Sequence, residues 1–465
     1  MQRSTRRTVL GSIASLPVLG MSWDMAIAGT AGLPTTADVQ GILTRRIDEE
    51  KQSLGMIVAL VSGAGRRVVA RGVRYGADSR PPGADSLFNI GSIAKIFTAV
   101  LLADSVRRGE LHMADPVQQY LPASYSLPRF KDREITLTDL VTHTSGLPTT
   151  PDDFPPETDL AAQSAYGRAQ FASFLSRLRL SEQPGTHWNY SNFNYALLGE
   201  ALAFRTRRDF RVLMKERVLE PLNLSSTFMS LESAVRDRVI PFHDLQRREI
   251  LQEPTPALPG FGGMYSCAYD LLTLVGAFMG LRRTPLAGPM AAMMRTRRPI
   301  GAYRGDQALG PQIYGDPTHV QIGHAGSTSG HSSAILWDPT QFGVVVLSNT
   351  SPPVMDIAFH LLDPRLPLSA PMRGVSVDAK SLLRYVGRYD GGAGMVFVVA
   401  LEGEKLTFEN PGFAPKIEMV PESEGVFNVP RVGARIVFEG AAPAPPQSLH
   451  IDLAGTRYAG KRMTD

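Results

Sequence analysis

The sequence predicts an α+β protein in which a sheet built from two distant parts of the chain is covered by helices, followed by a small C-terminal antiparallel β-barrel-like domain. Two observations lead to this prediction. In the first 362 residues, β-prone runs flank a long helix-rich stretch, and one sheet assembled from both flanks accommodates that order. From about residue 363 the chain changes to short β-prone runs separated by Gly and Pro, which is typical of small antiparallel β folds.

The composition is that of an ordinary globular protein. With 465 residues, 43% of them hydrophobic, the chain can bury a large core in two or three structural units. The net charge is only +4 and no basic block occurs, so nucleic acid is not indicated as a partner. The single cysteine, Cys267, excludes an intrachain disulfide, and C-x-x-C and H-E-x-x-H patterns are absent. We therefore expect no metal and no organic cofactor.

The N-terminus has the pattern of an export signal. The pair Arg6-Arg7 precedes an apolar run over residues 9–21, and residues 26–28 offer a small-residue cleavage site. The pattern resembles a twin-arginine signal; the alternatives are a disordered tail or an uncleaved anchor. No later stretch reaches the ~20 apolar residues of a membrane span. We expect residues 1–28 to be removed, leaving a periplasmic or secreted protein without a stable membrane span.

The elements of the main region, residues 35–362, follow from periodicity and turn signals. In chain order we expect a helix at 37–51, strands at 55–61 and 67–72, a buried helix over the apolar run at 96–103, a mostly helical stretch at 101–298, strands at 321–323, 331–337 and 343–349, and a short helix at 354–362. Because the flanking strands would share one sheet, residues near 92 and near 324 are expected to be neighbours.

Three prolines, at positions 364, 367 and 371, mark a linker at residues 363–379. The C-terminal domain, residues 380–465, is expected to contain strands at 395–401, 405–408, 425–429, 434–438 and 448–453.

Ser92 and Lys95 are the first candidates for chemistry. The chain has 8 Lys against 40 Arg, and only here does a Ser precede a Lys by three residues. A Lys in a dry site can lose its proton, whereas an Arg cannot. The spacing places both side chains on one helix face, near unpaired N–H groups of the first turn that could stabilise an oxyanion. The alternative is two unrelated surface residues.

Tyr190 and Asn192 form the only Y-x-N pattern. A phenol of pKa ~10 is a poor base, but an adjacent Lys ammonium favours its anion. Tyr190 could then take a proton from Ser92 and return it to a leaving group. The amide of Asn192 can bridge a Lys and a substrate carbonyl. The alternative is a polar loop that caps the helix beginning near Tyr195.

His324, Gly326 and Ser327 belong to the only H-x-G pattern, which follows the strand expected to end at residue 323. Gly326 would allow a substrate backbone to approach closely. Ser327 could supply a second oxyanion N–H and a hydroxyl. The alternative is a structural His in a Gly-rich turn.

The three motifs occur once each, in the order S-x-x-K, Y-x-N and H-x-G. With them, the chain resembles the serine β-lactamase and penicillin-binding-protein superfamily. It is most similar to the class C-type branch, which includes D-Ala-D-Ala carboxypeptidases, D-aminopeptidases and esterases. The resemblance covers roughly residues 35–362 and extends to Thr142–Pro148, Gly262–Ser266, Gly323–Gly330 and Val345–Asn349. It implies a β-lactamase-like fold, with a helical domain packed on an antiparallel sheet flanked by helices and the site at their junction.

The resemblance also implies a role for each matching position. Ser92 would be the acylated nucleophile, Lys95 its partner in proton transfer, Tyr190 the general base and Asn192 the substrate-positioning amide, with His324 in the place of the third motif's cation and the backbone N–H groups of Ser92 and Ser327 forming the oxyanion hole.

One departure from the family pattern affects the expected substrate. Class C β-lactamases usually carry Lys-Thr-Gly at the third motif, where this chain has His-Ala-Gly. A Lys is a fixed cation that holds a substrate carboxylate, whereas a His is near half-charged around pH 6.5. We therefore expect an exported serine hydrolase that acts on D-amino-acid peptides or small esters through a Ser92 acyl-enzyme. The alternatives are a class C-type β-lactamase and a penicillin-binding sensor that acylates without efficient turnover.

Two C-terminal stretches, Leu382–Tyr389 and Gly455–Met463, resemble the small β domain appended to some family members. The domain would be either a stabilising appendage or a lid near the catalytic mouth. The sequence indicates no oligomeric state.

Overall fold

The computed structural model describes residues 32–463 with short internal gaps. The gaps are residues 76–78, 156–158, 245, 252–255, 301–304, 317–318, 370–376, 393–394, 411–413, 430–433, 441 and 454–455. The expected export signal lies outside the described residues, as does the central part of the expected linker.

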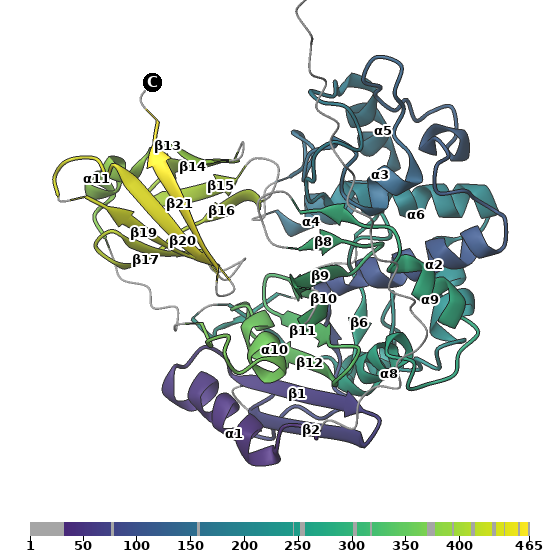
Figure 1. The fold of residues 1–465 in the computed structure, drawn as a ribbon, viewed down its shortest axis with the longest axis horizontal. Coiled ribbons are helices and arrows are strands. Elements are labelled where there is room, and N and C mark those ends of the chain that lie inside the picture. The colour runs from purple at the N-terminus through teal and green to yellow at the C-terminus, as the bar shows by residue number, and fades with distance from the viewer. Residues whose placement is uncertain are drawn as a thin grey trace, which may run out of the picture.

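An antiparallel sheet forms the centre of the main region, in the order β2-β1-β12-β11-β10-β9-β8-β7 (Figure 1). Its strands are β1 (Gly55–Ser62), β2 (Gly65–Gly72), β7 (Arg298–Pro299), β8 (Asp306–Gln307), β9 (Gln312–Asp316), β10 (His319–Ser327), β11 (Ser332–Trp337) and β12 (Gly343–Ser348). Strand β1 pairs with β12, which places Met56 opposite Ser348. The prediction that both flanks share one sheet is therefore confirmed.

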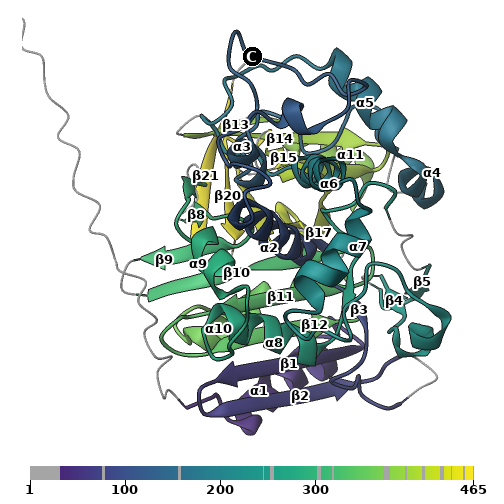
Figure 2. The same ribbon diagram turned by 90° about the vertical axis from the view of Figure 1, so that its right-hand side faces the viewer.

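Helices cover both faces of this sheet. One face packs against α1 (Thr36–Thr44), η1 (Arg45–Glu49) and α10 (Met355–Leu362). The other packs against α8 (Ala268–Phe278) and the helical region. Figure 2 shows α8 lying across the strands of the sheet. Strands β1, β11 and β12 are buried at every position, which explains why they are continuous hydrophobic runs rather than alternating ones.

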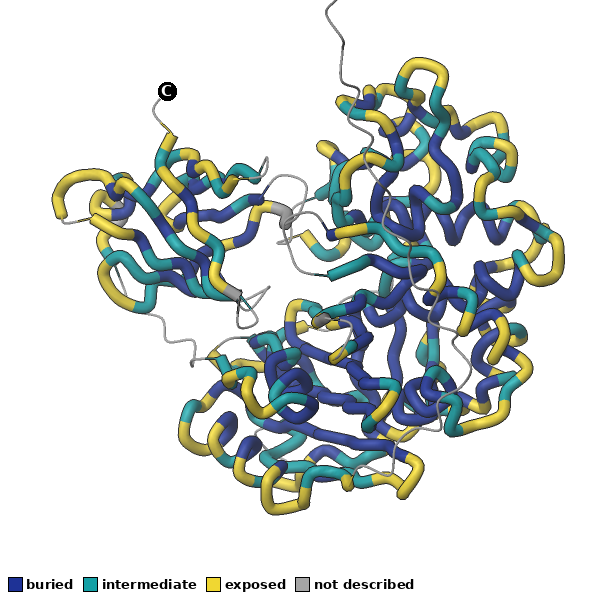
Figure 3. Tube along the Cα trace, viewed as in Figure 1, coloured by how far each residue is buried: buried dark blue, intermediate teal, exposed yellow. Residues whose placement is uncertain are grey.

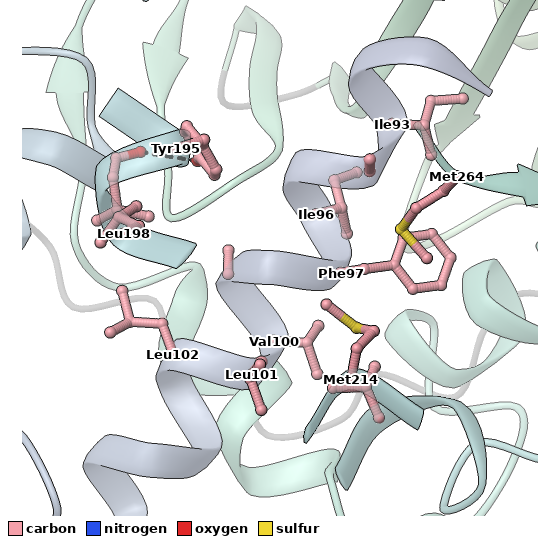
Figure 4. Close-up of a cluster of buried hydrophobic side chains, with 14 of the residues drawn as sticks. Ile93, Ile96, Phe97, Val100, Leu101, Leu102, Tyr195, Leu198, Met214 and Met264 are labelled. Atoms are coloured by element: carbon pink, nitrogen blue, oxygen red, sulfur yellow. Dashed lines mark hydrogen bonds between the residues drawn. The ribbon is translucent and has the colours of Figure 1, made fainter. Parts of the chain in front are cut away.

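The helical region is built around α2. Its elements are β3 (Phe88–Asn89), η2 (Gly91–Ile93), α2 (Ala94–Arg107), η3 (Val117–Tyr120), α3 (Leu137–Val141), α4 (Leu160–Ala165), α5 (Arg168–Arg177), α6 (Asn192–Thr206), α7 (Phe210–Met214), η4 (Lys215–Leu219), η5 (Ser233–Arg238), β4 (Phe242–His243), β5 (Glu249–Ile250), β6 (Tyr265–Ser266) and α9 (Ala287–Met293). Every residue of α2 from Ala94 to Ser105 is buried, and Figure 3 shows the buried interior of this region. A helix that is apolar on all sides belongs in a core, and Figure 4 shows its side chains among those of Tyr195, Leu198 and Met214.

The C-terminal region forms a second, nearly closed antiparallel barrel-like sheet (Figure 1). It begins with α11 (Ala379–Leu382) and η6 (Leu383–Tyr385) and continues through β13 (Gly387–Gly392), β14 (Met395–Glu402), β15 (Lys405–Asn410), β16 (Ala414–Glu418), β17 (Val420–Ser423), β18 (Val426–Val429), β19 (Ala434–Glu439), β20 (Ser448–Leu453) and β21 (Thr456–Arg462). It has its own core, centred on Tyr389, Phe397, Phe427 and Phe438.

The structure corrects several expected element boundaries. The first helix ends in a π-helical turn at Glu49, and the strand expected at 321–323 extends to Ser327. His324 therefore lies within a strand and not in a turn after it. Strands β7–β9 and, in the second sheet, β13, β16, β17 and β21 were not predicted. These strands are short or rich in Gly and polar residues, so their pairing depends on neighbouring strands and not on a local apolar pattern. Among the described residues, no helix has the length and apolar character needed to cross a bilayer.

Candidate active site

Ser92 lies in the turn η2, which leads directly into α2. The Nζ atom of Lys95 is 2.9 Å from the Oγ atom of Ser92, so the three-residue spacing brings the two side chains together as predicted. Ser92 is partly exposed, whereas Lys95 is 0% exposed. The pair therefore connects an accessible hydroxyl to an amine held in the dry interior.

Two further acceptors hold the Lys95 amine. It donates to Oδ1 of Asn192 at 2.8 Å and to the carbonyl oxygen of Phe261 at 3.0 Å. In the part of the chain that the structure describes, no carboxylate forms an ion pair with it. Burial lowers the pKa of Lys95 well below its ordinary value, because an ammonium loses its hydration there. The neutral form of the amine, which can accept a proton, is therefore far more populated here than at a surface Lys.

Tyr190 lies beside the same amine. Its ring centre is 5.0 Å from Nζ of Lys95, and its phenol interacts with the Ser92 side chain closely enough to affect its pKa. Burial raises the pKa of the Tyr190 phenol, and the interaction with Ser92 opposes that shift only in part. Burial thus disfavours both the phenolate expected for Tyr190 and the ammonium expected to stabilise it, since both ions lose solvation.

Two glycines bring β10 against the turn that carries Ser92. A Cβ atom on Gly326 would lie 2.0 Å from the carbonyl oxygen of Ile90, and one on Gly91 would lie 2.7 Å from the backbone nitrogen of Ser327. Gly91 also has a φ of +50°, which favours glycine. The sequence predicted that a substrate backbone approaches closely at Gly326, but in the structure the group in close contact with Gly326 is the carbonyl of Ile90. This contact places the backbone of Ser327 next to Ser92.

His324 lies in β10 and is only 4% exposed. Its ring centre is 6.1 Å from that of Tyr190. Its Nδ1 is 2.5 Å from the carbonyl oxygen of Ala325, a geometry that requires an N–H on Nδ1, while Nε2 is buried with no hydrogen-bond partner among the described residues. Burial, followed by the charge of Lys95, lowers the pKa of His324 to about 4. The ring is therefore neutral at pH 7 and does not provide the cation expected at the third motif.

Two groups at the site were not predicted. The carbonyl of Phe261 accepts a hydrogen bond from Lys95. Every residue has a backbone carbonyl, so the residue type does not indicate which one will act as an acceptor. The imidazole of His143 accepts a hydrogen bond from the backbone N–H of Ser191 at 3.1 Å and packs against the Tyr190 ring. The only sequence signal for either was its place within, or next to, the stretches Thr142–Pro148 and Gly262–Ser266 that resemble the family.

The chain belongs to the Beta-lactamase family, whose model matches residues 43–363. It is 25% identical over 340 residues to a β-lactamase of Pseudomonas fluorescens, an alignment that covers 66% of this chain and 91% of the relative. It is 28% identical over 225 residues to the D-alanyl-D-alanine-carboxypeptidase/endopeptidase AmpH of Escherichia coli K12. That alignment covers 47% of this chain and 55% of the relative, so it spans about half of each protein.

The fold is also shared with a solved relative. The crystal structure of the D-alanine carboxypeptidase AmpC from Burkholderia cenocepacia superposes with a TM-score of 0.60 at 25% identity, covering 71% of this chain and all of that one. Taken together, the family match and these relatives identify a serine hydrolase of the β-lactamase/DD-peptidase type.

We expect Lys95→Met to alter the pH dependence of stability. Between the lowered pKa of the folded protein and 10.5, the unfolded chain binds a proton at Lys95 that the folded chain does not, so raising the pH favours folding. In that window the unfolding free energy of the wild type should rise, relative to the variant, by up to about 1.4 kcal/mol per pH unit. Urea unfolding of both proteins from pH 7 to pH 10 measures this difference.

Lys380→Met, at an exposed position of α11, is the matched control for loss of a lysine. If the unfolding free energies of the wild type and Lys95→Met change in parallel with pH, Lys95 does not have the lowered pKa of a buried amine.

Proposed function

We propose that this protein is an exported serine hydrolase that cleaves amide or ester bonds through an acyl-enzyme on Ser92, with Lys95 and Tyr190 moving the proton. The observation that carries the proposal is the 2.9 Å contact between the Lys95 amine and the Ser92 hydroxyl. The amine is buried without a carboxylate partner among the described residues, which favours its neutral, proton-accepting form.

In the proposed reaction, Oγ of Ser92 attacks the substrate carbonyl carbon and its proton passes to the Lys95/Tyr190 pair. The tetrahedral oxyanion is held by the backbone N–H groups of Ser92 and Ser327. The carbon–nitrogen or carbon–oxygen bond then breaks, and the leaving amine or alcohol takes the proton back from the pair. Water then attacks the carbonyl carbon of the resulting ester of Ser92, and its proton passes to the pair. The bond between Oγ and the acyl carbon breaks and Oγ takes the proton back, which releases the acid and restores the hydroxyl.

We further propose that D-amino-acid peptides and small esters are preferred as substrates. A neutral His324 provides no cation at the third motif and therefore gives no charge-assisted hold on a substrate carboxylate. This favours substrates whose binding does not depend on a carboxylate at that position. A second candidate, a β-lactamase, is favoured by the alignment that covers 91% of a relative bearing that name.

We expect Ser92→Ala to abolish turnover of a nitrophenyl ester and labelling by a fluorescent penicillin. Loss of the nucleophile should lower kcat by at least about 10³-fold. Ser176→Ala is a matched control, because Ser176 is exposed on α5 and its hydroxyl donates to the carbonyl of Ser173 in its own helix.

Retention of both activities by Ser92→Ala would defeat the assignment of the nucleophile. In the wild type, a burst of one product per chain without a steady state would identify a penicillin-binding sensor and rule out the hydrolase.

We expect His324→Lys to shift the substrate preference towards carboxylates. A fixed cation should raise kcat/KM for nitrocefin relative to a neutral nitrophenyl ester by about 10-fold, through a charge-assisted hydrogen bond. His324→Gln keeps an uncharged side chain and should leave the ratio within about 3-fold of the wild type. The same assay with a D-alanyl-dipeptide-terminated peptide compares the three substrate classes directly.

A wild-type enzyme that already prefers nitrocefin by a wide margin would support the β-lactamase and overturn the proposed preference.

We also propose that residues 1–28 direct export. The support is the Arg6-Arg7 pair ahead of an apolar run and a small-residue cleavage site. Fused to a reporter enzyme that is detected only outside the cytoplasm, residues 1–35 should carry it there, and changing Arg6 and Arg7 together to Lys should abolish export. Arg3→Lys is the control. A reporter that stays inside the cell, or export that survives the double change, would contradict a twin-arginine signal.

A further inference from the structure

The segment that carries Tyr190, residues 185–191, contains no helix or strand. Its backbone is held by the stretch Thr142–Pro148. The N–H of Gly185 donates to the Thr144 carbonyl at 2.7 Å, and the N–H of Asn189 donates to the His143 carbonyl at 2.7 Å. The N–H of Ser191 donates to Nδ1 of His143 at 3.1 Å. His143 therefore binds the residues on both sides of Tyr190, once through its backbone and once through its side chain.

The ring of His143 also contacts Tyr190 directly. The two ring centres are 4.5 Å apart with planes inclined by 31°. The centre of the imidazole also lies 5.1 Å from the ring centre of Tyr195, in α6, and 6.1 Å from that of Trp188. The side chain is fully buried. Tyr190 is thus packed against a buried ring that has two further aromatic neighbours.

His143 reaches this position through an unusual backbone conformation. Its φ is +58°, in the left-handed region that side-chain-bearing residues rarely adopt. It follows the short helix α3, and its own N–H donates to the carbonyl of Leu140. The left-handed turn directs its carbonyl and its ring towards the Tyr190 segment at the same time.

The hydrogen bonds of His143 also define its charge state. Because the Ser191 N–H donates to Nδ1, that nitrogen carries the lone pair and the proton of the neutral ring is on Nε2. Nε2 is buried, and no residue in the described part of the chain forms a hydrogen bond with it. Burial, then Lys95 and His324, lowers the pKa of His143 well below its ordinary value. A protonated ring would lose the bond to Ser191, so the neutral form is the one that holds the segment.

We propose that His143 is a positioning residue for the reaction: its ring and its two hydrogen bonds hold the Tyr190 phenol in reach of Ser92. The inference rests on the proposed function, because it requires that Tyr190 takes part in proton transfer. His143 contacts neither Ser92 nor Lys95 by hydrogen bond among the described residues. It acts on the reaction through Tyr190.

The test removes the imidazole without straining the backbone. His143→Gly keeps the left-handed turn, and should lower kcat for a nitrophenyl ester by about 100-fold, the cost of a small misplacement of a reacting group. KM should change by less than about 3-fold, since substrate contacts remain. His143→Asn tolerates the left-handed turn and offers Oδ1 to the Ser191 N–H. It should recover at least about 10-fold of the loss. His243→Asn, which alters a buried histidine that hydrogen-bonds the Asn349 carbonyl, controls for general destabilisation.

A double-mutant cycle separates positioning from a purely structural role. If His143 acts through Tyr190, His143→Gly should cost less than about 3-fold when Tyr190 is already Phe. A full 100-fold loss in that background, or a loss in His143→Gly that Asn does not recover, would overturn the inference. Full activity of Tyr190→Phe alone would instead defeat the proposed role of Tyr190. Thermal unfolding shows whether each variant folds. If His143→Gly does not fold, the same comparison is made with His143→Asn in the wild type and in Tyr190→Phe.

Discussion

A buried amine, with no counter-ion among the described residues, is the constraint around which the candidate active site is arranged. Lys95 projects from the first turn of a helix that is buried on all sides, so its ammonium cannot be hydrated and its pKa falls. Three acceptors surround the nitrogen, from the turn η2, the start of α6 and the loop before β6. Segments separated by more than 160 residues must therefore converge for the amine to be satisfied, and that convergence requires the whole helical region.

The same burial acts on every ionisable group nearby. The pKa values of Lys95, His143 and His324 are lowered and that of Tyr190 is raised, so each group is driven towards its neutral form. In a site of such low charge, an oxyanion formed on the substrate would be the dominant ion. Fixed backbone dipoles stabilise an ion more strongly in such surroundings than in water. The neutral charge state of His324 in the third motif and the lowered pKa of Lys95 are therefore two consequences of the same burial.

Backbone geometry, more than side-chain bonding, sets the distances in the site. Gly91 and Gly326 allow β10 to touch the turn before α2, which no residue with a Cβ atom could do without moving the chain. The loop that carries Tyr190 has no regular structure of its own and takes its shape from the stretch around His143. The central sheet supplies the frame, and short irregular segments set the positions of the candidate site residues on it.

The sequence by itself determined the α+β class, the sheet assembled from both flanks and the pairing of Ser92 with Lys95, because these follow from local periodicity and from a spacing within one helical turn. It also indicated that Tyr190, Asn192 and His324 belong together, through the order of three rare motifs. Only the tertiary structure decided that His324 is neutral and lies inside a strand, that Phe261 contributes a backbone acceptor and that His143 packs on Tyr190. Charge states and backbone contacts of this kind depend on which distant segments exclude water from a group, and no local pattern of residues encodes that.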